Sequence, residues 1–160
     1  MIVATIIGMD NIAVKPQGCT NIKLRQLTRR VARYYEAEVG KTGLKNTQYS
    51  LLSYVFKLGP IRPVDLAAAM KIDASTLTRN LKPLVAAGWL TLEAGNDARS
   101  RIVAITDAGR DKRQEAQRRW RVAQENINQV LGPQRVVELH ALIDDCMGLL
   151  SPAEEEETNE

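Results

Sequence analysis

Hydroxyl and basic side chains gather between positions 75 and 82, and their types suggest one kind of chemistry. They are Ser75, Thr76, Thr78, Arg79 and Lys82, and no acidic residue interrupts them. Hydroxyls and cations together suit a partner that offers both hydrogen-bonding edges and anions, such as the bases and phosphates of a DNA major groove. An ordinary solvated helix face has the same composition, so this stretch alone leaves both interpretations open.

The element that must position these side chains is an amphipathic helix. Asp73 is a suitable N-cap, and Gly88 suits the left-handed position just after the helix end. Apolar residues repeat at steps of four, three and one, so they share the buried face. They are Leu77, Leu81, Leu84 and Val85. Pro83 removes one backbone hydrogen bond inside the helix, which predicts a kink.

A hairpin with a cationic tip is predicted directly after this helix. Residues 89–93 alternate apolar and polar side chains, residues 95–97 form a turn signal, and residues 101–105 supply the return strand. A cationic loop beside a polar helix can place an arginine in a minor groove while the helix occupies the next major groove. The tip carries Asp97, Arg99, Ser100 and Arg101. We expect Asp97 to orient Arg99 through a salt bridge, because a carboxylate would repel phosphate.

Four separated motifs then suggest a family. They are residues 75–79 (STLTR), 88–90 (GWL), 97–100 (DARS) and 105–109 (ITDAG). In this order and spacing they resemble the MarR family of winged helix-turn-helix transcriptional regulators. The resemblance implies that the first motif lies on the recognition helix, the third at the wing tip, and the fourth at the start of a long helix. Pro83 departs from the family pattern.

The resemblance implies a sequence-specific regulator of transcription that binds double-stranded DNA as a homodimer, more a repressor than an activator. Two recognition helices related by a two-fold axis would enter major grooves about 34 Å apart, so the operator would be a pseudo-palindrome. The expected base or phosphate contacts are Ser75, Thr76, Thr78 and Arg79, with Lys82 on phosphate and Arg99, Ser100 and Arg101 in the wing. A winged helix that binds a protein and no DNA is the alternative.

The predicted fold class is mainly α, with one small β-hairpin. Residues 1–18 are expected to be a flexible leader, and residues 19–150 a single domain. Its winged lobe spans about 47–106, and the dimerisation helices span about 20–40 and 107–150. In the helix predicted for 47–58, the residues expected to face inward are Tyr49, Val55, Phe56 and either Leu52 or Ser53. The tail at 151–160 is acidic, and its composition predicts disorder.

The long helix at 107–131 carries a seam of apolar residues. Its members follow spacings of four, three, four and three, as in helices packed along a shared axis. They are Ala116, Trp120, Ala123, Ile127 and Val130. At about 1.5 Å per residue the helix spans about 40 Å, enough to leave the winged lobe and reach a partner. The following helix repeats an apolar face through Val136, Leu139 and Ile143, which needs a cover from a second chain.

The charge of the chain favours nucleic acid over an acidic small substrate. The net charge is +3, but residues 153–160 contain five glutamates and no cation, and without them the balance is +8. Between positions 71 and 121, eleven basic residues face six acidic ones. The positive excess is therefore centred on the stretch expected to bind DNA.

The residues that enzymes and metal sites need are missing from the sequence. It contains one histidine, His140, and no phosphate-binding glycine loop or hydrolase motif, so we expect neither an enzyme nor a cofactor or metal. Cys19 and Cys146 have neither metal-ligand spacing nor a disulfide framework, which favours a reducing cytoplasm. No apolar run is long enough to span a membrane.

The signal that would release DNA is less defined. The family resemblance implies a small aromatic or phenolic anion bound between the dimerisation and winged lobes. The candidates for that pocket are Arg33, Tyr34, Tyr54 and Trp120, each of which also suits plain packing. A second possibility is redox sensing through Cys19, at the start of the first helix near Lys23 and Arg25.

Overall fold

The computed structural model describes residues 16–95 and 100–150. Most of the predicted leader, the acidic tail, and the wing-tip residues Asp97 and Arg99 therefore lie outside the described residues. The elements are α1 (Thr20–Val39), the short 3-10 helix η1 (Gly40–Thr42), α2 (Asn46–Leu58), α3 (Pro63–Met70), α4 (Ala74–Ala86), β1 (Leu90–Ala94), β2 (Arg101–Ile105), α5 (Asp107–Leu131) and α6 (Pro133–Leu150). These elements confirm a mainly helical winged-helix fold.

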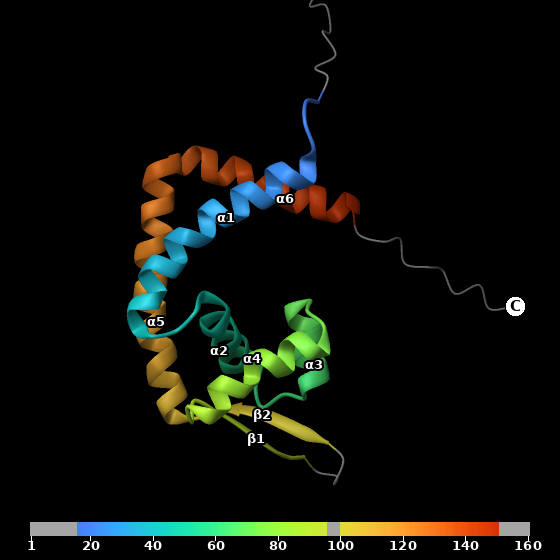
Figure 1. Cartoon of the computed structure of the whole chain (residues 1–160), viewed down its shortest axis with the longest axis vertical. Helices are drawn as coiled ribbons and strands as arrows, with labels where there is room; N and C mark the ends of the chain where they lie inside the picture. Colours follow the sequence, from blue (N-terminus) through green and yellow to red (C-terminus); the bar gives the residue numbers. More distant parts are fainter. Residues whose placement is uncertain (1–15, 96–99, 151–160) are drawn as a thin grey trace, which may run out of the picture.

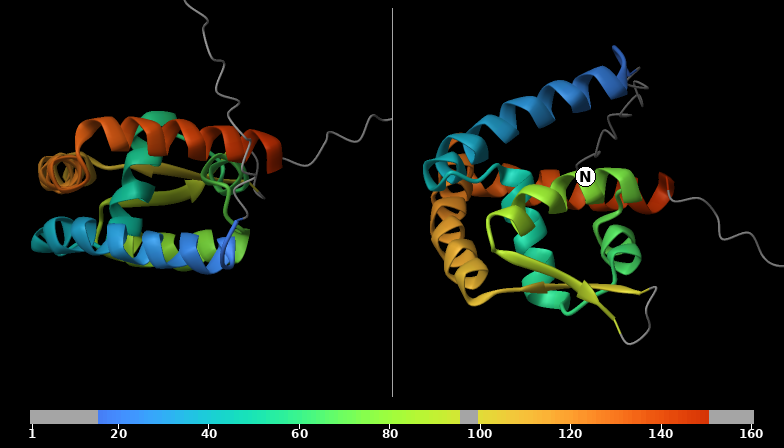
Figure 2. Two further views of the ribbon diagram at one scale, coloured as in Figure 1. Left: turned by 90° about the horizontal axis from the view of Figure 1, so that it is seen from above. Right: turned by 60° about the horizontal axis from the view of Figure 1, so that its bottom comes forward.

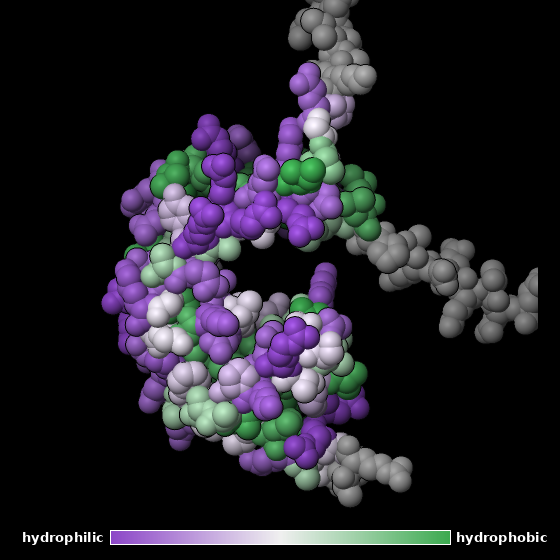
Figure 3. Space-filling view, viewed as in Figure 1, coloured by the Kyte–Doolittle hydropathy of each residue, from purple (hydrophilic) through white to green (hydrophobic). Residues whose placement is uncertain are grey.

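The elements form two groups joined by α5 (Figure 1). The lower group is the winged lobe, made of α2, α3, α4 and the hairpin. The upper group is α1 and α6, which lie on opposite sides of the molecule when it is seen from above (Figure 2). Because α5 runs along one side only, the chain has the outline of a C, and a wide hollow separates α1 from the winged lobe (Figure 3).

A leucine-rich core holds the winged lobe together. It includes Leu52 and Val55 from α2, Leu66 from α3, and Leu84 from α4, all with no exposed surface. Full burial of each such side chain contributes about 1.5–3 kcal/mol. The predicted apolar face of α4 is confirmed, since Leu77 and Leu81 are also buried. The polar side of α4 is consequently forced outward.

The hairpin packs on this core in a fixed register. Leu90 pairs with Ile105, and Ala94 pairs with Arg101 at the far end. Ile61, before α3, adds a single antiparallel bridge to Val103, with backbone N to O distances of 3.0 and 2.8 Å. The hairpin is therefore connected both to the segment before α3 and to the end of α4.

Small residues on α5 allow α1 to approach closely. Ala116 and Ala123 are fully buried in the interior of α5. The Tyr35 hydroxyl on α1 donates a 2.6 Å hydrogen bond to Gln124 Oε1, and the Tyr35 and Trp120 rings lie 6.0 Å apart. The predicted seam on α5 is confirmed at Ala116, Ala123 and Ile127, and it serves first to hold α1 within the same chain.

Two positions predicted to face inward do not. Phe56 is 42% exposed and Val130 is 63% exposed. Neighbouring positions such as Val55 and Phe56 point about 100° apart on a helix, and the buried direction belongs to Val55. Phe56 instead lies under the guanidinium groups of Arg110 and Arg113 from α5. Val130 lies at the end of α5, where nothing in the described chain covers it.

The upper helices leave apolar surface exposed. Large side chains at the free ends of α1 and α6 are more than half exposed, and they form green patches at the upper right of Figure 3. They include Ile22, Leu24, Leu142, Met147, Leu149 and Leu150. None of the described helices is both long and apolar enough to cross a membrane.

Gly109 provides a test of the packing between α5 and the hairpin. A Cβ added there would lie 2.0 Å from the carbonyl oxygen of Trp89, which is backbone and cannot easily move. We expect Gly109→Ala to lower the free energy of unfolding by about 1–3 kcal/mol in urea titrations. Gly40→Ala is the matched control, because a Cβ at Gly40 meets nothing within 4 Å. Equal stability of the two variants would contradict the close approach.

Candidate nucleic-acid interface

The start of α4 is organised by the carboxylate of Asp73. Asp73 Oδ1 accepts from the Thr76 backbone N at 2.8 Å and from the Ser75 hydroxyl at 2.5 Å, and Oδ2 accepts from the Thr76 hydroxyl at 2.7 Å. The hydrogen bond from Ser75, followed by those from Thr76, holds the pKa of the Asp73 carboxyl below its ordinary value. The predicted N-cap is therefore confirmed.

These bonds change the part that the hydroxyls can play at the surface. The hydroxyls of Ser75 and Thr76 already donate hydrogen bonds to the Asp73 carboxylate, and the Thr78 hydroxyl donates to the Ala74 carbonyl at 2.9 Å. In this arrangement each hydroxyl can still accept a hydrogen bond. To donate to a base or phosphate it must first leave its present partner.

Arg79 and Lys82 are the charged members of the same surface. Both are exposed, and neither forms an ion pair within residues 16–95 and 100–150. They lie three residues apart on α4, so they project from adjacent positions on one face. Pro83 is also exposed, and α4 continues through it to Ala86.

A hydrogen-bonded junction fixes the hairpin relative to α4. The Thr106 hydroxyl donates to the carbonyl of Gly88 at 2.7 Å, and the Thr106 backbone N donates to that of Trp89 at 3.1 Å. The same hydroxyl accepts from the Gly109 backbone N at 3.0 Å and caps α5. The end of α4, the base of the wing and the first turn of α5 therefore meet at one side chain.

The wing is described up to its tip. Arg101 is exposed at the start of β2, and Ser100 is half-buried. The Gly95 backbone N donates to the Ser100 carbonyl at 2.8 Å and closes the hairpin below the tip. The hairpin projects past α4 at the same end of the molecule (Figure 2). The expected contacts from Arg99 and its orientation by Asp97 fall outside the described residues and stay predictions.

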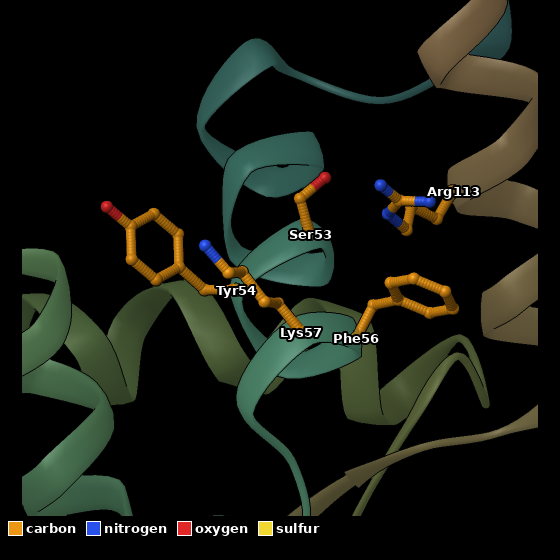
Figure 4. Close-up of a pocket in the computed structure, with 5 residues that line it drawn as sticks. All are labelled: Ser53, Tyr54, Phe56, Lys57 and Arg113. Carbon is orange, nitrogen blue, oxygen red and sulfur yellow. The ribbon is translucent and has the colours of Figure 1, made fainter.

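The candidate effector residues do not share one hollow in the described chain. Tyr34 lines a hollow between α1 and α5, and Arg33 lines another that is formed by α1 residues alone. Tyr54 lines a third between α2 and α5 (Figure 4). Trp120 packs on Tyr35 against the core. The sequence did not point to Ser53 and Arg113 of the third hollow, since they lie 60 positions apart with no shared motif.

The two cysteines lie on the surface of the upper helices. Cys19 is the N-cap of α1, and both Cys19 and Cys146 are exposed. The redox role of Cys19 stays a prediction. Within residues 16–95 and 100–150, no cluster of three or more histidine, cysteine or acidic side chains could hold a metal ion.

Comparison with known proteins agrees with this geometry. Residues 42–100, from the end of η1 to the wing, match the model of the MarR family. Over these residues the chain is similar to the MarR family. It is 27% identical over 93 residues to YwoH, an uncharacterised HTH-type transcriptional regulator of Bacillus subtilis, and the match covers 58% of this chain and 68% of that one.

Solved structures extend the likeness across both lobes. The regulator MosR of M. tuberculosis, solved in complex with DNA, is 28% identical with a TM-score of 0.65 over 81% of this chain and 98% of that one. A mutant MarR from E. coli, solved with operator DNA, shares the fold with a TM-score of 0.74 at 20% identity, covering 79% and 92%. Members of the MarR family are transcriptional regulators and not enzymes.

The Asp73 cap generates a prediction about pH. Because the pKa of Asp73 is lower in the folded chain than its unfolded value of about 3.9, the cap stabilises the fold above that pH and loses its effect as the pH falls below it. Asp73→Ala should lower the thermal unfolding midpoint at pH 7, and the difference from the unmodified chain should shrink at pH 3. Asp73→Asn, which keeps a capping oxygen, should lose less. A pH-independent difference would contradict the assignment.

Proposed function

We propose that the chain is a regulator of the MarR family, a homodimeric repressor that binds a pseudo-palindromic DNA operator through α4 and the wing. The observation that carries the proposal is a pair of exposed cations, Arg79 and Lys82, that form no ion pair among the described residues. They lie on a helix whose position is fixed to the wing through Thr106. DNA complexes of MosR and of the E. coli MarR mutant support it, because both proteins share this fold.

Each side chain on α4 has a proposed part. Arg79 is proposed to read a base edge, because a guanidinium can contact guanine through two hydrogen bonds. Lys82, a point charge one turn further along, binds phosphate. Ser75, Thr76 and Thr78 accept hydrogen bonds from base amino groups or donate to phosphate after leaving their intrahelical partners. In the wing, Arg99 and Arg101 follow the backbone of the neighbouring minor groove, assisted by Ser100.

The second copy is proposed to cover the upper helices. An apolar groove of about 380 Å³ lies between α1, α5 and α6, with Leu24, Leu139 and Ile143 among its lining. The exposed ends of α1 and α6 continue this surface. A monomer rarely leaves such a surface exposed, whereas dimer interfaces are rich in it. Closure by an identical copy places two copies of α4 on one side of the pair.

Release is proposed to follow from a small aromatic or phenolic anion that changes the separation of the two lobes. The wide hollow under α1 in Figure 3 leaves room for the winged lobe to move relative to the upper helices. Arg33, Tyr34, Tyr54 and Trp120 remain the proposed surroundings for this movement, although they line different hollows.

A DNA experiment tests the role of α4. Duplexes that bind the chain are first selected from fragments of its source genome, and affinities for a selected and a random duplex are then measured by fluorescence anisotropy. Arg79→Ala should lose about 1–3 kcal/mol more on the selected duplex than on the random one. Lys82→Ala should weaken both equally and reduce the salt slope by about one.

Arg118→Ala is the control for both variants, because Arg118 is an exposed cation on α5 away from the α4 face. An equal loss for Arg79→Ala on the two duplexes would make it a backbone contact. The absence of any selected duplex at low salt would overturn the repressor proposal and favour a protein-binding winged helix.

A second experiment tests the dimer. The variant with Leu142→Glu and Leu149→Glu places charges on two α6 side chains that are 61% and 78% exposed. If a second copy covers them, the dimer dissociation constant in sedimentation velocity should rise at least about tenfold, since a buried unpaired charge is costly. Val64→Glu is the matched control, as Val64 is 65% exposed on α3 in the winged lobe. Equal dissociation of both variants would contradict this interface.

A further inference from the structure

One side of α1 is densely basic. Five cations and no acidic residue lie between positions 23 and 33, and all five are exposed. None of them forms an ion pair with any of the described residues. Hydrophilic side chains cover the near side of α1 at the top of Figure 3, apart from the winged lobe. We call the five cations the α1 basic stripe: Lys23, Arg25, Arg29, Arg30 and Arg33.

The spacing of the stripe concentrates its charge. Arg25, Arg29 and Arg33 follow one another at steps of four residues, so they are neighbours along one line of the helix surface. Like charges at this spacing repel each other and destabilise a helix. Lys23 adds a cation near the start of α1, where the helix dipole favours anions and the first turn has no acidic residue. The stripe therefore lacks nearby carboxylates that would balance it.

The two carboxylates of α1 are engaged in other contacts. Glu38 pairs with Lys41 and with Arg119 of α5. Glu36 Oε1 accepts a hydrogen bond from the Asn46 backbone N at 3.4 Å. Both glutamates follow the stripe, near the end of α1. The described residues consequently offer the stripe no carboxylate partner.

The stripe lies away from the apolar side of α1. Leu24 and Val31 line the groove between α1, α5 and α6. At 3.6 residues per turn, Arg29 and Arg33 lie about 140° and 180° around the helix from Leu24. These two arginines line a separate hollow of about 400 Å³ that is formed by α1 residues alone. A second copy that covers the apolar side of α1 therefore leaves the stripe accessible.

The chain itself contains a segment of matching charge. Residues 153–160, which we call the acidic segment, carry five glutamates and no cation, against five cations in the stripe. The segment follows α6, and the free ends of α1 and α6 extend away from α5 on the same side of the molecule (Figures 1 and 2). Fully extended, residues 151–160 reach at most about 36 Å, and the 20 residues of α1 span about 30 Å. The acidic segment is therefore long enough to follow the stripe.

We propose that the α1 basic stripe binds the acidic segment of its own chain. Glutamates of the segment pair with the guanidinium groups of Arg25, Arg29 and Arg33, because arginine and carboxylate form two parallel hydrogen bonds. Lys23 pairs with a further glutamate. The segment is tethered to α6, so its effective concentration at α1 is independent of the protein concentration. Salt weakens the contact, since its charges lie on the surface.

The contact has a consequence for DNA binding. An open stripe of five cations attracts the phosphates of any sequence to a surface apart from α4 and the wing. The acidic segment excludes these phosphates, because it pairs with the cations and adds negative charge beside them. DNA binding is then confined to α4 and the wing. This consequence rests on the proposed function, whereas the contact between the acidic segment and α1 does not.

Carbodiimide cross-linking of the full chain tests the contact, because the reagent joins a carboxylate to an amine only where the two groups touch. At low salt, peptide mass spectrometry should find Lys23 linked to the glutamates at positions 154–157. Added salt of about 0.5 M should lower the yield at least about threefold, and dilution of the protein should not. Lys57 and Lys82 are exposed lysines of the winged lobe and serve as internal controls. Equal linking of all three lysines, or no link at Lys23, would overturn the proposal.

A pair of double variants tests the arginines of the stripe. Arg29→Gln with Arg33→Gln should lower the yield of the Lys23 cross-link at least about threefold, since two cations that hold the segment are lost. Arg118→Gln with Arg121→Gln is the matched control, because it removes the same charge from exposed positions of α5 outside the stripe. Equal yields in the two variants would contradict the role of the stripe.

Anisotropy with a random duplex measures the consequence for DNA. Replacing all five glutamates of the acidic segment with glutamine should tighten binding at least about threefold at low salt and steepen the salt dependence, because the stripe becomes open to phosphates. In that background, Arg29→Gln with Arg33→Gln should remove most of the gain, and Arg118→Gln with Arg121→Gln should keep it. A gain that survives both pairs equally would come from net charge alone and would overturn the shielding.

The two measurements separate this inference from the proposed function. A Lys23 cross-link in a chain that binds no selected or random duplex keeps the contact and removes the regulator. Binding of a selected duplex without any Lys23 cross-link keeps the regulator and removes the contact.

Discussion

The hydroxyl of Thr106 is the point on which the DNA-facing half of the molecule depends. It donates a hydrogen bond to the carbonyl of Gly88, just after α4. It also accepts one from the backbone N of Gly109 and so caps α5. The strand β2 ends one residue earlier, and the Thr106 backbone binds Trp89. Recognition helix, wing and long helix are therefore held by one residue and its neighbours. The absence of a side chain at Gly109 is part of the same constraint, because only a hydrogen fits against the Trp89 carbonyl.

A second constraint comes from the length of α5. Its 25 residues carry the chain from the wing to the upper helices, where the small side chains of Ala116 and Ala123 bring α1 close. A single chain can satisfy this seam, but none of its described elements covers the outer faces of α1 and α6. The burial pattern thus divides at the middle of α5. In the winged lobe the core is buried by residues of the described chain itself. In the upper helices, large apolar side chains are exposed to solvent.

Local features were predictable because neighbouring residues determine them. Asp73 as a cap, the alternation of residues 89–93 and the leucine face of α4 all act within one or two turns of chain, and the structure has them where the sequence placed them. Phe56 was expected to face inward together with Val55, but only Val55 is buried, and Phe56 lies against arginines of α5 whose position the local sequence does not reveal. The hydroxyls of Ser75 and Thr76 were assigned to DNA alone, since their capping bonds depend on side-chain rotamers that periodicity does not reveal. Ser53 and Arg113 meet only through the packing of α2 on α5.

The pairing of cations suggests how structural and binding charges are divided in this chain. Within the described residues, Arg119 of α5 and Lys41 both pair with Glu38 of α1, and Arg62 pairs with Asp65 at the start of α3 at 2.6 Å. These cations therefore form ion pairs within or between helices. An exposed pair such as Arg62 with Asp65 adds little stability, so an exposed cation loses little by having no such partner. What an unpaired cation gains is a local potential that attracts anions. Arg79 and Lys82, which form no ion pair among the described residues, supply that potential on α4.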